Sequence, residues 1–139
     1  GLISLATVAF AYARPTAEER FEVQYTFRDY ADDAIEAPAI AAVLTDMTTP
    51  DDCVYEWGRS SQIYFLADRE PCTRWLHDRP YEVEPAVLRE IMSDLEERRP
   101  AAILVTTDVL PPPELGAYIE QRYRFAAEVA YATLYERVD

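Results

Sequence analysis

The stretch from residue 53 to residue 77 constrains the fold more than any other part of the chain. A short aromatic run stops at Gly58 and is followed by a polar turn, an apolar segment, a charged break and a second short apolar run. This pattern predicts a strand at 53–57, a helix at 62–67 and a strand at 72–76. Because two strands separated by one helix are normally parallel neighbours with a right-handed crossover, the stretch predicts the start of a parallel sheet.

The flanking segments supply the other expected elements. A spacing of apolar residues typical of helices predicts a helix at 38–47, with Pro38 at its first position, and a second one from Pro85 to the stop at Pro100. The continuous apolar run at 101–106 predicts a central strand with Ile103 and Val105 buried. A third helix is expected at 111–123, with Arg122 on its buried side. The tail at 125–138 predicts one edge strand or a small hairpin.

This order of elements predicts an α/β fold. We expect a three-layer αβα sandwich with a mainly parallel, Rossmann-like sheet and a C-terminal edge strand or hairpin. Residues 30–139 are expected to form a single domain, and residues 1–29 an N-terminal arm or the stub of a membrane helix. The apolar opening covers about 13 residues, fewer than the ~20 that cross a bilayer. A terminal element packed on the core is the alternative. No methionine precedes Met47, so we expect a fragment of a longer protein.

The charge balance narrows the range of partners. The chain of 139 residues holds 13 basic and 26 acidic side chains, which gives a net charge of −13. Such a charge repels nucleic acid, and we expect no nucleic-acid partner.

Candidate ligand contacts follow from the expected sheet, because open parallel sheets bind ligands at the carboxyl ends of their strands. These ends are followed by Gly58, Arg59, Ser60 and Ser61 in the first case, His77 and Asp78 in the second, and Thr107 and Asp108 in the third. We select Arg59, Ser60, Ser61 and Asp108 as candidate ligand contacts, with Trp57 and Trp75 as candidate stacking surfaces. The alternative is a plain turn at 58–61 and two core tryptophans.

No catalytic or metal site is expected. His77 is the only histidine, and the chain has no HExxH or CxxC spacing. Neither Ser60 nor Ser61 lies in a GxSxG motif. We therefore expect no catalytic residue, no metal and no cofactor.

The two cysteines, Cys53 and Cys72, each begin an expected strand. Parallel neighbours bring such positions to a similar height, so a disulfide between them is geometrically conceivable. Two buried thiols are the alternative.

Several segments together resemble a known class of membrane enzyme. They are the helix that ends at 48–52, the strand at 54–58, the segments at 63–69, 71, 73–74 and 99–105, and the tail residues 123–125 and 134–137. Over residues 30–138 this pattern resembles the C-terminal soluble region of polytopic glycosyltransferases of the GT-C type, in the protein mannosyltransferase and aminoarabinose transferase superfamily.

The resemblance implies a non-catalytic accessory domain on the extracytoplasmic face of the cell membrane. Its partners would be the membrane-embedded part of the same polypeptide and a polyprenyl-phosphate-linked sugar or an acceptor. No catalytic residue carries over, because that machinery lies in the membrane part of such enzymes. A disulfide between Cys53 and Cys72 would persist there. The alternative is a free-standing α/β module that binds a small ligand or regulates another protein.

Overall fold

The computed structural model describes residues 31–76 and 84–139, without the side chains of residues 31–34. Residues Glu36–Asp139 form one compact unit. The expected arm at 1–29, together with His77 and Asp78, lies outside the described residues.

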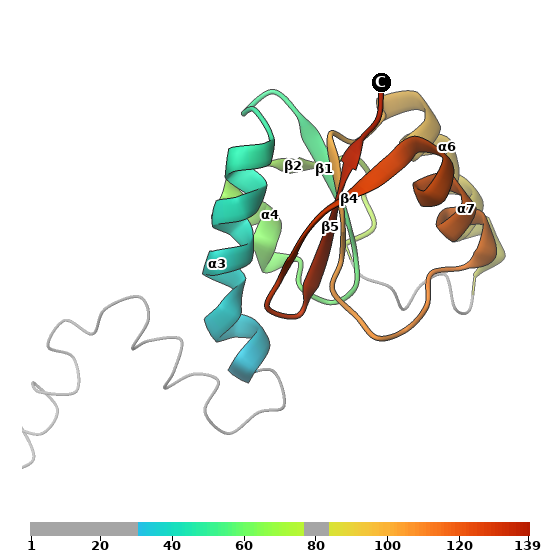
Figure 1. Ribbon diagram of the computed structural model, residues 1–139. Coiled ribbons are helices and arrows are strands. Elements are labelled where there is room, and N and C mark those ends of the chain that lie inside the picture. The colour runs from blue at the N-terminus through green and yellow to red at the C-terminus, as the bar shows by residue number, and fades with distance from the viewer. Residues whose placement is uncertain (1–30, 77–83) are drawn as a thin grey trace, which may run out of the picture. The chain divides into compact units, whose positions relative to one another are not determined.

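The described part of the chain contains helices and strands in regular alternation up to a final hairpin (Figure 1). The elements are α3 (Ala31–Met47), β1 (Cys53–Trp57), α4 (Gln62–Ala67), β2 (Glu70–Pro71), α6 (Pro85–Arg98), β3 (Ala102–Val105), α7 (Pro113–Arg122), β4 (Tyr123–Val129) and β5 (Ala132–Arg137). The chain is therefore an α/β protein, as its sequence predicts.

The five strands form one mixed sheet in the order β2-β1-β3-β5-β4. β1 pairs in parallel with β2 and with β3, whereas β5 pairs antiparallel with β3 and with β4. Half of the pairings are thus antiparallel, and the sheet is less parallel than expected. β5 returns directly beside β3 because a short hairpin, which needs no crossover helix, connects it to β4.

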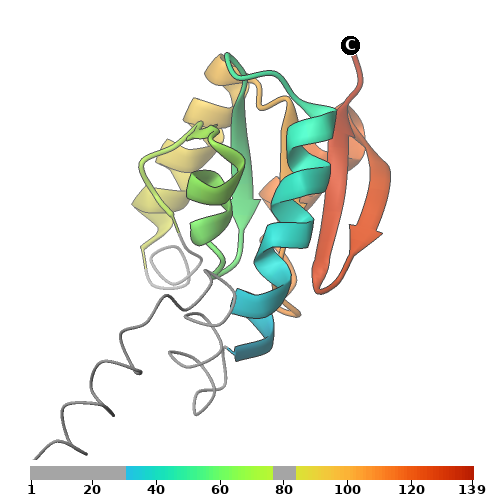
Figure 2. The same cartoon turned by 90° about the vertical axis from the view of Figure 1, so that its left-hand side faces the viewer.

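Helices cover both faces of this sheet. On one face α3 and α4 pack on Val54, Leu104 and Leu134, and Figure 2 looks onto this face. On the other face α6 and α7 pack on Tyr55, Trp57 and Ile103. Successive residues of β1 and β3 point to opposite faces, so these strands are buried on both sides. Ile103 is fully buried as predicted, whereas Val105 is only half-buried at the end of its strand.

The helices are the best-predicted elements. α6 begins at Pro85 and buries Val87, Ile91 and Leu95, in agreement with the apolar stripe. α3 starts earlier than expected and runs through Pro38, which is exposed. The alanine-rich sequence of this helix favours helical backbone enough to tolerate the hydrogen bond that proline removes.

The prediction that Arg122 of α7 lies on the buried side of its helix is wrong. Its side chain is about half exposed, and its guanidinium lies 3.3 Å from Glu96 and 5.9 Å from the centre of the Tyr118 ring. The aliphatic stem covers apolar surface while the charged end reaches water, so the position follows the apolar spacing without being buried.

The strand expected at 72–76 is wrong in position and length. β2 consists of Glu70 and Pro71, which pair with Cys53 and Val54. The chain leaves the sheet after Cys72 because the Thr73 hydroxyl donates to the Trp75 carbonyl at 3.0 Å and accepts from the Trp75 N–H at 3.1 Å. A side chain that satisfies nearby backbone groups in this way forms a tight turn instead of a strand.

The tail adopts the hairpin, one of the two expected alternatives. Its turn lies at Ala130–Tyr131, with Ala130 in the left-handed region at φ 53°. A bulge between Phe125 and Ala127 shifts the register of β4 against β5. β4 forms the edge of the sheet, and β5 is an interior strand.

Candidate functional site

The connections between strands change direction at β1. The chain leaves β1 through α4 to β2 on one side and then passes through α6 to β3 on the other. The two connecting helices pack on opposite faces. In open α/β sheets, ligands bind outside the carboxyl ends of the two strands at such a switch point. Here these strands are β1 and β3, whose final residues Trp57 and Val105 pair with each other.

A buried carboxylate lies beneath this edge of the sheet. Glu56, in β1, is 1% exposed. Its Oε1 accepts a hydrogen bond from the Ser60 backbone N–H at 3.1 Å and another from the Thr106 hydroxyl. Ser60 follows β1 and Thr106 follows β3, so one carboxylate fastens the two loops of the switch point to each other.

Gly58 makes this contact possible. Its φ of 150° is a backbone conformation that other residues rarely adopt. A Cβ at this position would overlap the Thr106 hydroxyl and would lie 2.7 Å from Glu56 Oε1. The glycine that the sequence indicates as a turn is therefore required because the backbone passes directly against the Glu56–Thr106 pair.

The side chain of Tyr64, in α4, contacts the backbone of Glu56. The Glu56 N–H donates to the Tyr64 hydroxyl oxygen at 2.7 Å. β2 pairs only with Cys53 and Val54, and Tyr64 supplies an acceptor further along β1. Burial, and then the charge of Glu56, raise the pKa of the Tyr64 hydroxyl well above its ordinary value. The hydroxyl is therefore neutral at physiological pH.

Trp57 fixes the loop after β3. Its side chain is buried in the core beneath α6 and α7, and its Nε1 donates to the Val109 carbonyl at 3.2 Å. The Val109 N–H in turn donates to the Thr107 hydroxyl at 3.2 Å. Trp57 is thus a core aromatic, and its buried ring offers no surface on which a ligand could stack.

The selected polar residues lie at this edge with different exposure. Arg59 and Asp108 are exposed, and Ser61 is half-buried. Ser60 is 1% exposed, and its backbone N–H is bound to Glu56. Arg59, Ser61 and Asp108 therefore provide accessible polar groups, whereas Ser60 mainly holds the loop.

Trp75 lies in the turn after β2 instead of a strand. It is half-buried against the core beneath α6 and α7, and the Arg74 guanidinium carbon lies 4.9 Å from its ring centre. Arg74 Nε is 2.7 Å from Glu90 of α6. This ion pair and the tryptophan attach the turn to α6, which favours a packing role for Trp75.

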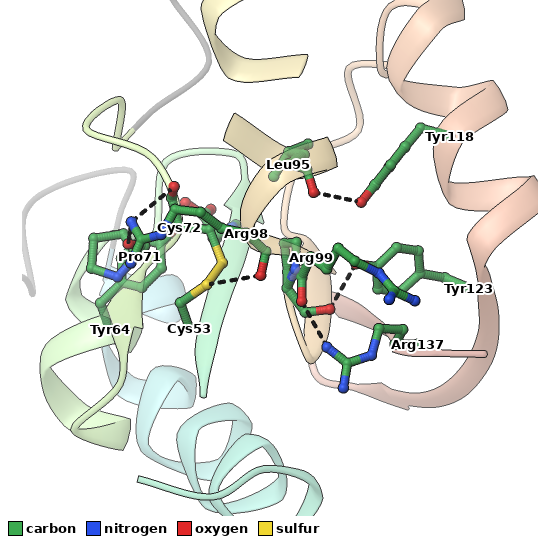
Figure 3. Close-up of a disulfide and its surroundings, with 12 residues drawn as sticks. Cys53, Tyr64, Pro71, Cys72, Leu95, Arg98, Arg99, Tyr118, Tyr123 and Arg137 are labelled. Carbon is green, nitrogen blue, oxygen red and sulfur yellow. Dashed lines mark hydrogen bonds between the residues drawn. A yellow bond between two sulfur atoms is a disulfide. The ribbon is translucent and has the colours of Figure 1, made fainter. Parts of the chain in front are cut away.

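The opposite end of the sheet carries the disulfide (Figure 3). Cys53 at the start of β1 is bonded to Cys72, and their Cα atoms are 5.1 Å apart. Arg98, at the end of α6, donates from Nη1 to the Cys72 carbonyl at 3.1 Å and to the Pro71 carbonyl at 3.3 Å. The start of β1, the end of β2 and the end of α6 are therefore joined at one point.

A hollow of about 820 Å³ opens at this amino end of β1. Its lining includes Cys53, Asp51, Asp52, Asp68, Glu70 and Arg98. Sequence reasoning looks only at the carboxyl ends of the strands, so it does not anticipate a hollow here.

Arg69 also lines the hollow, although its side chain is largely buried. The guanidinium makes five hydrogen bonds. Its acceptors are the carbonyls of Thr45, Thr48, Ala67 and Asp68 and the Thr48 hydroxyl. These groups belong to the C-terminal ends of α3 and α4, where carbonyls lack helical partners and carry partial negative charge. Arg69 is therefore a structural cation that joins two helix ends.

The carboxyl edge supplies groups for binding a polar ligand. Arg59 and Asp108 offer one charge of each sign, and the Ser61 and Thr107 hydroxyls can donate and accept hydrogen bonds. Within residues 31–76 and 84–139, no group of three or more His, Cys, Asp or Glu side chains is placed to hold a metal ion.

Sequence reasoning misses Glu56, Tyr64 and Thr106. The available signal is Glu56 itself, a charged residue inside an otherwise apolar, aromatic strand. Such a residue is either exposed on an edge or buried with hydrogen-bond partners. The partners Tyr64 and Thr106 lie 8 and 50 residues away, so spacing alone could not identify them.

No family model, curated protein or solved structure matches this chain. Within the described ranges, none of the helices has the length and apolar character needed to cross a membrane.

Proposed function

We propose that this chain is a non-catalytic accessory domain of a polytopic glycosyltransferase of the GT-C type. It would lie on the extracytoplasmic face of the cell membrane, where the parent enzyme uses a polyprenyl-phosphate-linked sugar. The observation that carries the proposal is the Cys53–Cys72 disulfide. Structural disulfides persist in oxidising compartments, and the extracytoplasmic side is also the side that the sequence resemblance implies.

The topology supports a finer proposal about the fold. The unit from β1 to β3 is a Rossmann-like core, to which β5 and β4 add two antiparallel strands. The support is the switch point at β1, with α4 and α6 on opposite faces of the sheet.

The edge at β1 and β3 is the proposed contact surface for the acceptor or the lipid-linked sugar. The exposed guanidinium of Arg59 suits a phosphate group, and Asp108 with the Ser61 hydroxyl suits sugar hydroxyls. The hydrogen bonds of Glu56 hold the loops at 58–61 and 106–109 in place before a ligand arrives. Loops that are already ordered lose little conformational freedom on binding.

The first test is a titration of the full chain with a soluble polyprenyl-phosphate analogue, followed by NMR. We expect chemical-shift changes at residues 59–61 and 106–108, weakened by Arg59→Gln and Asp108→Asn. Asp94→Asn on α6 is the matched control for a lost carboxylate.

Transferase, sugar-hydrolase and phosphatase assays are expected to show no turnover. Turnover abolished by Ser60→Ala or His77→Ala would favour an independent enzyme. Binding of small polar ligands without the analogue would favour a free-standing module.

The second test concerns the compartment. Intact cells that express the parent gene are treated with a membrane-impermeant reductant and then with a membrane-impermeant maleimide. We expect Cys53, the more accessible of the two cysteines, to be labelled without lysis. Labelling that requires lysis would exclude the extracytoplasmic location.

A further inference from the structure

The two sulfur atoms of the disulfide differ in their surroundings. Cys72 is completely buried, whereas Cys53 is half-buried and lines the hollow at the amino end of β1. A thiol that enters this hollow meets Cys53 first. Because thiol–disulfide exchange requires direct approach to one sulfur, accessibility decides which sulfur is attacked.

The segment that contains Cys72 has few other backbone connections to the sheet. β2 pairs with β1 through only Cys53↔Glu70 and Val54↔Pro71. One further backbone hydrogen bond joins the Cys72 N–H to the Val54 carbonyl at 2.9 Å. Beyond these, Arg98 and the Arg74–Glu90 ion pair attach the segment at 70–76 to α6, not to the sheet. The disulfide therefore adds a covalent attachment to a short backbone pairing and to the packing of Cys72 and Trp75 in the core.

We propose that Cys53 is a thiol-exchange site and that the disulfide is a latch, which thiols open from the acidic hollow.

An incoming thiolate attacks Cys53 Sγ and forms a mixed disulfide there, while the Cys53–Cys72 bond breaks. Cys72 leaves as a thiolate and takes a proton from water. A second thiolate attacks the incoming sulfur of the mixed disulfide and releases Cys53. Two external thiols are oxidised to a disulfide, and the protein disulfide is reduced by two electrons. The segment at 70–76 then separates from β1.

The charge around the hollow selects the thiol. Asp51, Asp52, Asp68 and Glu70 line it together with Arg98 and the fully engaged Arg69. Carboxylates outnumber the arginines, and the whole chain carries a charge of −13. Anionic thiols are therefore repelled and cationic thiols attracted, an effect that salt reduces.

The first experiment locates the attacked sulfur in the unmodified full chain. The oxidised protein is exposed briefly to cysteamine, quenched with acid, alkylated and mapped by peptide mass spectrometry. We expect the cysteamine adduct on Cys53 to exceed that on Cys72 by about tenfold or more. An adduct found mainly on Cys72, or equally on both, overturns the proposal. No substitution is needed, so the result does not depend on whether a variant folds.

The second experiment tests the charge selection. Opening rates are compared for cysteamine and 2-mercaptoethanesulfonate, each divided by its rate with oxidised 2-mercaptoethanol as an uncharged reference. We expect about a threefold or larger preference for cysteamine at low salt, which disappears near 1 M salt. The double variant Asp68→Asn/Glu70→Gln should reduce the preference, and Asp94→Asn/Glu97→Gln on α6 is the matched control. Equal rates at low salt overturn the role of the hollow.

The third experiment measures the release of the segment by hydrogen exchange. In the reduced protein, the Cys72 amide should exchange about tenfold faster or more, while the amides of Ala102–Val105 keep their protection. Unchanged exchange at Cys72, or equal loss of protection in β3, overturns the latch. These three results do not depend on any glycosyltransferase assay, so the latch and the proposed function can fail separately.

Discussion

Glu56, Gly58 and Thr106 constrain one another at the carboxyl edge of the sheet. A carboxylate removed from water requires hydrogen-bond donors, and the Ser60 N–H and the Thr106 hydroxyl provide them. The backbone at residue 58 must then pass so close that no Cβ fits. The identity of residue 58 is therefore set by a side chain two positions earlier and by Thr106, in the loop after β3.

Gly58→Ala should lower the free energy of unfolding by about 2–4 kcal/mol, through backbone strain and the overlap with Thr106. Urea denaturation measures the change. Gly116→Ala in α7 is the matched control, because its added Cβ meets no atom within 4 Å. This helical position should become more stable, by about 0.5–1 kcal/mol. A loss at residue 58 no larger than ordinary surface scatter contradicts the assignment.

Arg69→Met should destabilise the protein by about 2–4 kcal/mol, because carbonyls at the ends of α3 and α4 lose their donors. Arg69→Lys should recover only part of the loss, since an ammonium lacks the planar fork of a guanidinium. The exposed Arg89→Met on α6 is the control and should stay within about 0.5 kcal/mol. Thermal and urea denaturation give the values. Full rescue by lysine would show that charge alone suffices.

Residue-level prediction from sequence succeeds where one local rule decides the outcome. The exposed Arg59 and Asp108 follow from their place after strands. The burial of Ser60 and Arg69 does not follow from local rules, because it depends on acceptors contributed by Glu56 and by the ends of two helices.

At the scale of elements, the helices were predictable and two β features were not. The helical spacing of apolar residues in α6 extends over 14 residues. A pattern of this length does not depend on any single side chain. β2 has two residues, which is too short for any periodicity. The apolar residues after it suggest a strand, but the Thr73 side chain forms a turn there. The hairpin turn uses Ala130 with positive φ, where glycine or asparagine would have marked it.

The Arg74–Glu90 ion pair connects the turn after β2 to α6 and should be sensitive to pH. Bonding to Arg74 lowers the pKa of the Glu90 carboxyl below its ordinary value. The folded state therefore gains stability above the unfolded pKa and loses it as the pH falls through the folded pKa. NMR titration should show Glu90 ionising below the ordinary range of a glutamate carboxyl. In Arg74→Gln the pKa of Glu90 should rise towards its ordinary value. An unchanged titration contradicts the coupling.

At the scale of the whole molecule, the sequence predicts the layers better than the strand directions. Apolar runs identify β1 and β3 as strands covered on both faces, which requires helices on both sides. Whether the next strand runs parallel or antiparallel depends on its connection. The two-residue turn between β4 and β5 forces an antiparallel return beside β3, and that turn has no distinctive sequence.

The disulfide should contribute to global stability as well as to the local latch. It joins residues 19 positions apart, and closing such a loop in the unfolded chain removes conformational entropy equivalent to about 3 kcal/mol. Urea denaturation of the oxidised protein, the reduced protein and Cys53→Ser/Cys72→Ser measures this contribution. We expect the last two to agree with each other, to remain folded and to unfold at lower urea than the oxidised form. Equal midpoints for the oxidised and reduced forms would contradict this expectation. They would mean that strain from the bond in the folded state cancels the entropic stabilisation.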